Sequence, residues 1–282
     1  MKINFLGTAA ATSYPLVFCK CKVCEQARKL GGCNFRKRSS LLINKDLLID
    51  LGPDIMSASF MYNISIADVR YCLQTHSHSD HFDASHLSTR LPEYAVENIP
   101  KLKLYASNAT LNKMSEMLKA EGYITDILNT VEQERLNLDV HPIKALQSFE
   151  AGKYQISAFS ANHDKSIGSL LYAITEDNYT IFYGSDTDII PEETWSGFHD
   201  KKLQFDVVVL DHTYGPNING REHLNANGFI KQIQRMRDEN LFKEHTRIFA
   251  THISHEGNPI HSDLVDYGKK NGYEIAYDGL II

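Results

Sequence analysis

The sequence of 282 residues predicts an α/β protein, because short β-prone runs alternate with segments of helical periodicity. Residues 102–105 alternate like a strand, and Ser107 then provides a helix cap before an apolar stripe at helical spacing. Residues 205–210 form the most apolar run, so we expect a central strand, and Asn225 caps the helix predicted after it. No linker, low-complexity tract or change of composition divides the chain, which predicts one domain over residues 1–282.

The other elements follow from local patterns. Two apolar runs flank Asn44-Lys45-Asp46, which is typical of a hairpin, and Pro53 is suited to open the next helix. Gly122 is expected to end the helix capped by Ser107. Further strands are predicted at residues 3–6, 41–43, 47–49, 69–74, 154–160, 170–174, 180–183, 247–250 and 273–277.

Composition excludes several classes of function. The net charge of -6 and pI near 6.1 argue against a surface for nucleic acid or an anionic membrane. No apolar run approaches the ~18 residues that span a bilayer, and residues 1–7 lack the pattern of a signal peptide. We therefore expect a cytoplasmic protein with no membrane partner. Five cysteines, three of them clustered, indicate metal binding in this setting rather than disulfides.

The sequence His76-Ser77-His78-Ser79-Asp80-His81 follows the predicted strand at residues 69–74 and carries four potential metal ligands. Extended backbone places His76 and His78 on the same side of the chain, so both imidazoles can face one ion. Asp80 and His81 fall where the chain must turn and can face a second point nearby. Imidazole and carboxylate ligands suit zinc, manganese or iron.

This H-x-H-x-D-H motif resembles the signature of the metallo-β-lactamase-fold hydrolases. The resemblance implies an αββα four-layer sandwich with two divalent metal ions, zinc or manganese, at one edge. The oxygen-reducing di-iron branch usually has Glu at the position of His78, which favours hydrolysis here. Two ions ~3.5–4 Å apart would lower the pKa of a shared water, so that a metal-bridging hydroxide attacks the substrate.

The same resemblance implies the remaining ligands, each of which ends a predicted strand. His163 would join His76 and His78 on the first ion, and His252 would join Asp80 and His81 on the second. Asp186 would bridge the two ions, and Asp50 matches the family's early aspartate, which supports the metal loop from outside the ligand set. The histidines that match no motif are interpreted as ordinary polar residues: His86, His141, His199 and His261.

Cys19, Cys21 and Cys24 form a C-x-C-x2-C motif within the Cys-rich loop at about residues 19–33, and thiolate-bound zinc needs a fourth ligand. Cys33 is close in sequence. His255 is the better candidate, because His252-Ile253-Ser254-His255 resembles a segment of the phosphoribosyl cyclic phosphate phosphodiesterase branch. That resemblance implies one structural zinc and extends to residues 272–279, whereas residues 84–141 contain no motif that we can match.

His223 stands just before the helix capped by Asn225, where that branch places a catalytic histidine. It could donate a proton to the leaving alkoxide or hold a phosphate oxygen. Asp211, after the apolar strand, is suited to orient it, and His212 is a rival partner. Asp80 serves the catalytic site as a metal ligand.

We therefore expect a metal-dependent phosphodiesterase acting on a small phosphorylated metabolite, such as a cyclic ribose phosphate. One alternative is a ribonuclease Z-like enzyme, although the net acidity and the lack of an added basic arm count against nucleic acid. Another is a zinc-binding interaction protein related to the metallo-β-lactamase proteins of pyrroloquinoline-quinone synthesis. The sequence leaves the oligomeric state open and is compatible with a homodimer.

Overall fold

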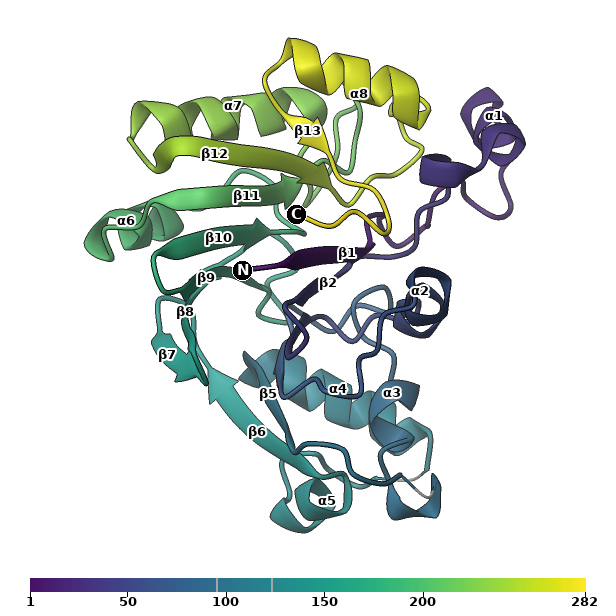
Figure 1. The fold of residues 1–282 in the computed structure, drawn as a ribbon, viewed down its shortest axis with the longest axis vertical. Coiled ribbons are helices and arrows are strands. Elements are labelled where there is room, and N and C mark those ends of the chain that lie inside the picture. Colours follow the sequence, from purple (N-terminus) through teal and green to yellow (C-terminus); the bar gives the residue numbers. More distant parts are fainter. Residues whose placement is uncertain (95, 123) are drawn as a thin grey trace.

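The computed structural model describes residues 1–94, 96–122 and 124–282, and within them two β-sheets pack face to face (Figure 1). The first sheet has the strand order β1 (Ile3–Gly7), β2 (Ser40–Ile43), β3 (Leu47–Ile49), β4 (Tyr71–Leu73), β5 (Leu102–Ser107) and β6 (Leu138–Ile143). The hairpin pairs β2 with β3 as predicted, and β3 to β6 run parallel. Parallel strands direct their carboxyl ends to one edge of a sheet.

The second sheet has the order β13 (Glu274–Ile275), β12 (Phe242–Thr251), β11 (Phe205–Asp211), β10 (Tyr179–Gly184), β9 (Leu170–Glu176), β8 (Tyr154–Ser160) and β7 (Ser148–Ala151). β10, β11 and β12 are parallel, and β8 runs in the same direction because β9 is antiparallel to both β8 and β10. β11 is an interior strand as expected, although β10 holds the middle position. The carboxyl ends of these four strands therefore share one edge.

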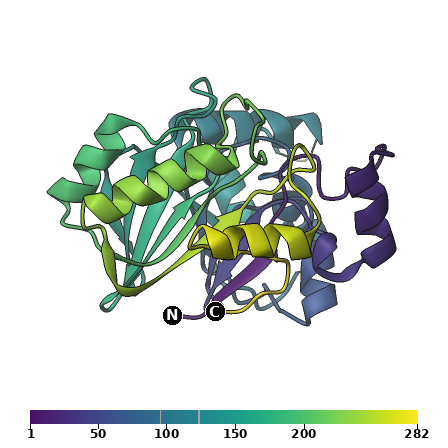
Figure 2. The same cartoon turned by 90° about the horizontal axis from the view of Figure 1, so that it is seen from above.

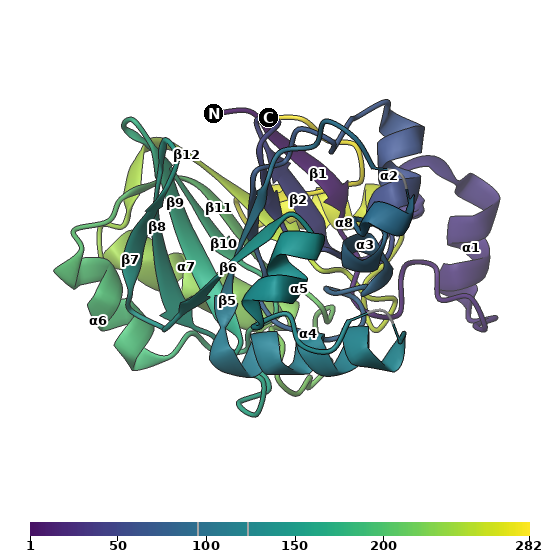
Figure 3. The same ribbon diagram turned by 90° about the horizontal axis from the view of Figure 1, so that it is seen from below.

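Helices cover the outer face of each sheet. α2 (Ile55–Tyr62), α3 (Ser85–Ser88), α4 (Asn108–Ala120) and α5 (Thr130–Arg135) accompany the first sheet (Figure 3). α6 (Glu192–Asp200), α7 (Ala226–Asp238) and α8 (His261–Lys270) accompany the second (Figure 2). The remaining elements are α1 (Lys22–Leu30), which projects from the sandwich in Figure 1, and the short turns η1 (Gly32–Asn34) and η2 (Pro92–Tyr94). This arrangement confirms the predicted αββα sandwich.

Strand β11 explains why its sequence is apolar throughout. Val207 and Val209 belong to the core between the sheets, whereas Val208 and Leu210 belong to the core beneath the helices. A strand that is buried on both faces has no solvent side to mark with polar residues. At ~25 cal/mol per Å² of apolar surface, full burial of each such valine contributes on the order of 1.5–3 kcal/mol before chain entropy is counted.

The predicted helices that begin with a capping residue are confirmed. The Ser107 side chain accepts a hydrogen bond from the Thr110 amide at the start of α4, and Asn225 does the same for Gly228 in α7. α2 begins only at Ile55, two residues after Pro53. Within the residues that the structure describes, no helix is long and apolar enough to cross a membrane.

The predicted strand at residues 273–277 is shorter in the structure, where β13 has two residues. Beyond it the chain leaves β12 and runs along β1, so that the Ile3 amide donates to the Ile282 carbonyl at 2.8 Å and the Phe5 amide to the Leu280 carbonyl at 3.0 Å. The two termini therefore lie close together (Figure 1). β6 and β7 were not predicted, because they are edge strands with an interrupted apolar pattern.

Candidate metal centre

The sequence-predicted ligands meet at the edge where the carboxyl ends of both sheets come together. His76, His78, Asp80 and His81 follow β4; His163 follows β8, Asp186 follows β10 and His252 follows β12. The two sheets are joined at this edge, since the Leu170 amide donates to the Thr75 carbonyl at 3.0 Å and the Tyr172 hydroxyl to the Gln74 carbonyl at 2.9 Å. Residues separated by more than 170 positions thus contribute to one site.

The first group of donors consists of His76, His78 and His163. His78 Nδ1 lies 3.1 Å from His76 Nε2 and 3.1 Å from His163 Nε2. Two nitrogens bound to one tetrahedral zinc at 2.0–2.1 Å stand about 3.3 Å apart, so these separations fit a shared ion. Three imidazole nitrogens that converge at such distances cannot all donate hydrogens to one another. The donor set therefore fits a metal ion.

The second group consists of Asp80, His81, Asp186 and His252, all of them buried. His81 Nε2 lies 3.2 Å from Asp80 Oδ2 and 3.0 Å from Asp186 Oδ2. Although these oxygens are close, neither is aligned for a hydrogen bond with this nitrogen, which is unusual for a buried polar atom and expected of a metal ligand. His252 Nε2 completes the group at 3.1 Å from Asp186 Oδ1.

Asp186 stands between the two groups. Its Oδ1 atom lies 3.9 Å from His76 Nε2 and 4.0 Å from His163 Nε2, while its carboxylate also contacts the second group. This placement is what a bridging carboxylate requires. The φ angle is 64° at Asp50, 57° at Asp186 and 61° at His252. These three functional positions therefore adopt the strained left-handed region of the backbone.

The electrostatics of the centre favour a cation. Burial lowers the pKa of His76 well below its usual value, so the ring is neutral and available as a ligand. Burial acts in the same direction on His81, but nearby carboxylates, led by Asp186 and Asp80, outweigh it and raise the pKa of that ring well above its usual value. In the protein without metal, His81 is therefore protonated, and its positive charge balances the buried carboxylates of Asp80 and Asp186.

Asp50 supports the metal loop from outside the ligand set, as the sequence suggested. His81 Nδ1 donates to its Oδ2 at 2.6 Å, and the Thr75 amide donates to its Oδ1 at 2.7 Å. Gln74 was missed by sequence reasoning, yet its side-chain amide donates to Asp50 and to the carbonyls of His76 and His81. Its place in an apolar strand was the only signal: a polar side chain that is completely buried there needs partners.

His223 lies beside the two groups and is oriented by Asp211. Its Nδ1 donates to Asp211 Oδ2 at 2.8 Å, and its ring stacks on that of His252 with centroids 5.1 Å apart. Burial opposes the charged form of His223, but the Asp211 carboxylate prevails and raises the pKa of the ring to about 9. Of the two partners left open by the sequence, the structure places Asp211 here, whereas His212 contacts the Tyr273 hydroxyl at 3.0 Å.

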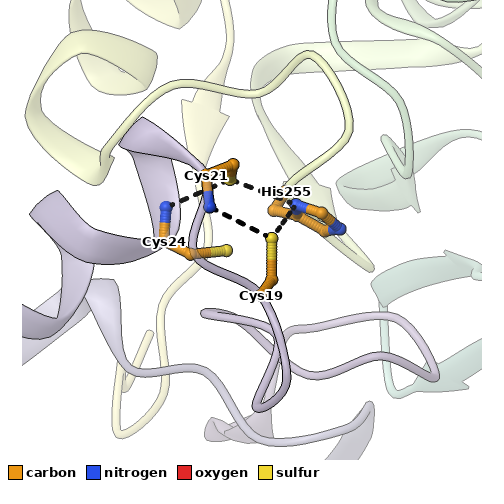
Figure 4. A group of neighbouring side chains, drawn as sticks. All are labelled: Cys19, Cys21, Cys24 and His255. Atoms are coloured by element: carbon orange, nitrogen blue, oxygen red, sulfur yellow. Dashed lines mark hydrogen bonds between the residues drawn. The ribbon is translucent and has the colours of Figure 1, made fainter.

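The cysteine cluster brings His255 together with Cys19, Cys21 and Cys24 (Figure 4). His255 Nδ1 is 3.8 Å from Cys19 Sγ and 3.6 Å from Cys21 Sγ, and the Cys24 thiol is within 4.8 Å of these atoms. Three sulfurs and one imidazole suit a four-coordinate zinc. Cys33, in η1, is not part of this group. His255 is therefore the residue that the fold brings to the three cysteines.

Comparison with known proteins supports the fold. A family model described as the β-lactamase superfamily domain matches residues 45–253. No curated protein matches the sequence. A diphosphatase from the PhnP family is 18% identical over 100% of this chain and 96% of its own, with a TM-score of 0.74.

Two further solved structures are similar over their whole lengths. Zinc-bound PqqB from Methylobacterium extorquens is 19% identical over 100% of this chain and 99% of its own, with a TM-score of 0.72. The short form of human tRNase Z is 16% identical over 100% of this chain and 98% of its own, with a TM-score of 0.64. At these identities the likeness concerns the fold, and activity has to be argued from the site.

Proposed function

The chain belongs to the β-lactamase superfamily, and from this premise we propose that it is a metal-dependent phosphodiesterase acting on a small phosphate ester, such as a cyclic or ribose phosphate. The observation that carries the proposal is the pair of His223 and Asp211 beside two groups of metal ligands. Two of the similar structures have names that denote cleavage of phosphate linkages, a diphosphatase and a tRNase.

Two divalent ions, zinc or manganese, would be held by the two groups with Asp186 between them. When bound, the ions would activate water and neutralise an anionic substrate. The ligands are His76, His78 and His163 for one ion and Asp80, His81 and His252 for the other, with Asp186 shared. A structural zinc would occupy the cysteine cluster.

His223 would protonate the oxygen of the leaving group. A raised pKa keeps the ring protonated at neutral pH, and Asp211 holds Nδ1, so Nε2 is the atom left to donate. The His163 ring lies 4.8 Å from the His223 ring between centroids, so the donor stands next to the first group as well. An alkoxide is a poor leaving group without such a proton.

A polar cavity of about 510 Å³ borders His223 and is of metabolite size. Its lining includes Asp188, Asn219, Asn227 and Lys231. Amide groups, one carboxylate and one lysine suit the hydroxyl groups of a sugar better than the apolar body of a lactam. The cavity therefore favours a small, hydroxylated substrate.

The test is hydrolysis by metal-loaded protein of a panel of cyclic ribose phosphates, nitrophenyl phosphodiesters, RNA, thioesters and lactams. His223→Ala should keep its metals and lose roughly 10²–10⁴-fold on alkyl esters, the usual range for a positioned acid. The loss should shrink on nitrophenyl esters, whose leaving group needs no proton. His199→Ala is the matched control, since His199 is an exposed histidine paired with Glu239. Turnover of lactams or thioesters without any phosphodiester would overturn the proposal.

A further inference from the structure

Thr213 lies two residues beyond Asp211 and contacts both Asp211 and the metal-ligand candidate His252. Its hydroxyl donates to Asp211 Oδ1 at 2.8 Å and lies 2.7 Å from His252 Nδ1. His252 Nδ1 is 3.7 Å from the nearer Asp211 oxygen, which is too far for a direct hydrogen bond. The threonine hydroxyl therefore bridges the metal-ligand histidine and the carboxylate that orients His223.

Counting donors gives the tautomer of His252. An ionised carboxylate only accepts hydrogen bonds, and Asp211 receives them from the Thr213 amide, the Thr213 hydroxyl and His223 Nδ1. The single hydroxyl proton of Thr213 is thus used towards Asp211. Its oxygen must then accept from His252, so the proton of that ring is on Nδ1 and the lone pair of Nε2 faces Asp80 and Asp186.

We propose that Thr213 is a positioning residue: its hydroxyl fixes His252 as the Nδ1–H tautomer and makes one carboxylate, that of Asp211, serve both the second metal ion and His223. The proposal rests on the metal centre described under the proposed function. A hydrogen-bonded partner of this kind fixes the orientation of a ligating histidine and raises its basicity.

The backbone of Thr213 keeps the hydroxyl in place. Its carbonyl accepts from the Ser254 amide at 3.1 Å, the Ser254 hydroxyl at 2.8 Å and the Asn258 side chain at 2.9 Å. Ser254 adjoins His255 of the cysteine cluster, and the Thr213 side chain is buried. The same residue therefore also anchors the segment that leads to the structural zinc site.

The experiment measures zinc affinity of the full chain by chelator competition, with the cysteine site kept saturated. Thr213→Val keeps the shape of the side chain and removes its hydroxyl. The affinity for one of the two active-site zinc ions should fall roughly 10–100-fold. Thr213→Ser should restore wild-type affinity. Thr194→Val is the control, because Thr194 in α6 is also a buried threonine, and its hydroxyl donates to the Ser160 carbonyl at the end of β8. The zinc affinity of this variant should be unchanged.

A second measurement does not depend on the folding of Thr213→Val. In zinc-loaded wild-type protein with ¹⁵N-histidine, long-range correlation spectra should show His252 with its proton on Nδ1, assigned by the signals lost in His252→Asn. Zinc on Nδ1, unchanged affinity in Thr213→Val, or equal weakening in Thr213→Ser or Thr194→Val would each overturn the proposal. Neither measurement uses a substrate, so a failed phosphodiesterase assay leaves this result standing.

Discussion

The buried centre and the cysteine cluster differ in how their residues are drawn from the chain. The centre collects side chains from the ends of four strands, between His76 and His252, and its second group is entirely buried. The cluster takes three residues from one short segment, with Cys24 in the first turn of α1, and a single distant one, His255. Cys21 is exposed. The two sites nevertheless share one segment, since His252 and His255 are three residues apart.

The difference predicts different consequences of metal loss. The fold holds the buried ligands in place through Asp50, Gln74 and the two sheets, so loss of metal should leave the shape of the centre largely intact. The cysteine loop protrudes from the sandwich, and an ion there would close a loop of more than 200 residues to the segment after β12. We therefore expect the buried centre to control activity and the cysteine cluster to control local stability.

The largest expected effect is on activity, from Asp186→Asn. Removing the charge shared by both groups should cost several kcal/mol of transition-state stabilisation, which is at least ~10³-fold in rate. Elemental analysis should show loss of active-site metal while the cysteine zinc is kept. Asp200→Asn, at the exposed end of α6, is the matched control. A fully active variant with one ion fewer would contradict the two-metal assignment.

Cys21→Ser should have the largest effect on stability. The variant should lose one zinc ion per chain and several kcal/mol of unfolding free energy, since structural zinc binding contributes to folding. Thermal unfolding and metal content measure both quantities. Cys33→Ser changes a cysteine of the same loop outside the cluster and should keep both. Equal zinc content and equal melting temperature in the two variants would show that the cysteine cluster is not a structural zinc site.

Asp50→Asn should have an intermediate effect, confined to the buried centre. An amide accepts a weaker hydrogen bond from His81 Nδ1 than a carboxylate does, so metal affinity should fall about 10–100-fold. Titration with a zinc chelator measures it, and the cysteine site should be unaffected. Asp54→Asn, which loses the ion pair with Arg38 instead, provides the control.

The smallest expected effect is on the pH dependence of stability, through His261 at the start of α8. Burial, reinforced by the positive charge of Arg36, lowers the pKa of His261 to about 4. The unfolded chain then binds more protons than the native protein between pH 6.5 and 4, so the free energy of unfolding should fall as pH falls through that window. His261→Gln should show a smaller slope in denaturant titrations. An identical dependence of the unfolding free energy on pH in the variant and the wild type would mean that other residues cause the acid sensitivity.

Local patterns were sufficient for α2, α4 and α7, the central strands and the ligand types, whereas α3, α5, α6 and α8 were not predicted. Caps such as Ser107 and Asn225 act within one turn, and the H-x-H-x-D-H spacing places two imidazoles on one side of a strand. Strand β6 was not predicted, because it lies at the edge of its sheet and only its first and last side chains are buried. The strand at residues 102–105 and the helix after Ser107, in the same part of the chain, were predicted from their periodicity.

By itself the sequence determined the class of fold and the list of potential ligands, because periodicity and residue chemistry are local properties. Only the tertiary structure showed that the two groups implied by the family resemblance meet at one edge, that Asp211 rather than His212 faces His223, and that Thr213 and Gln74 connect the parts. Those outcomes depend on which strand ends meet across two sheets. Burial, together with left-handed backbone at Asp50, Asp186 and His252, then determines the direction in which each side chain points.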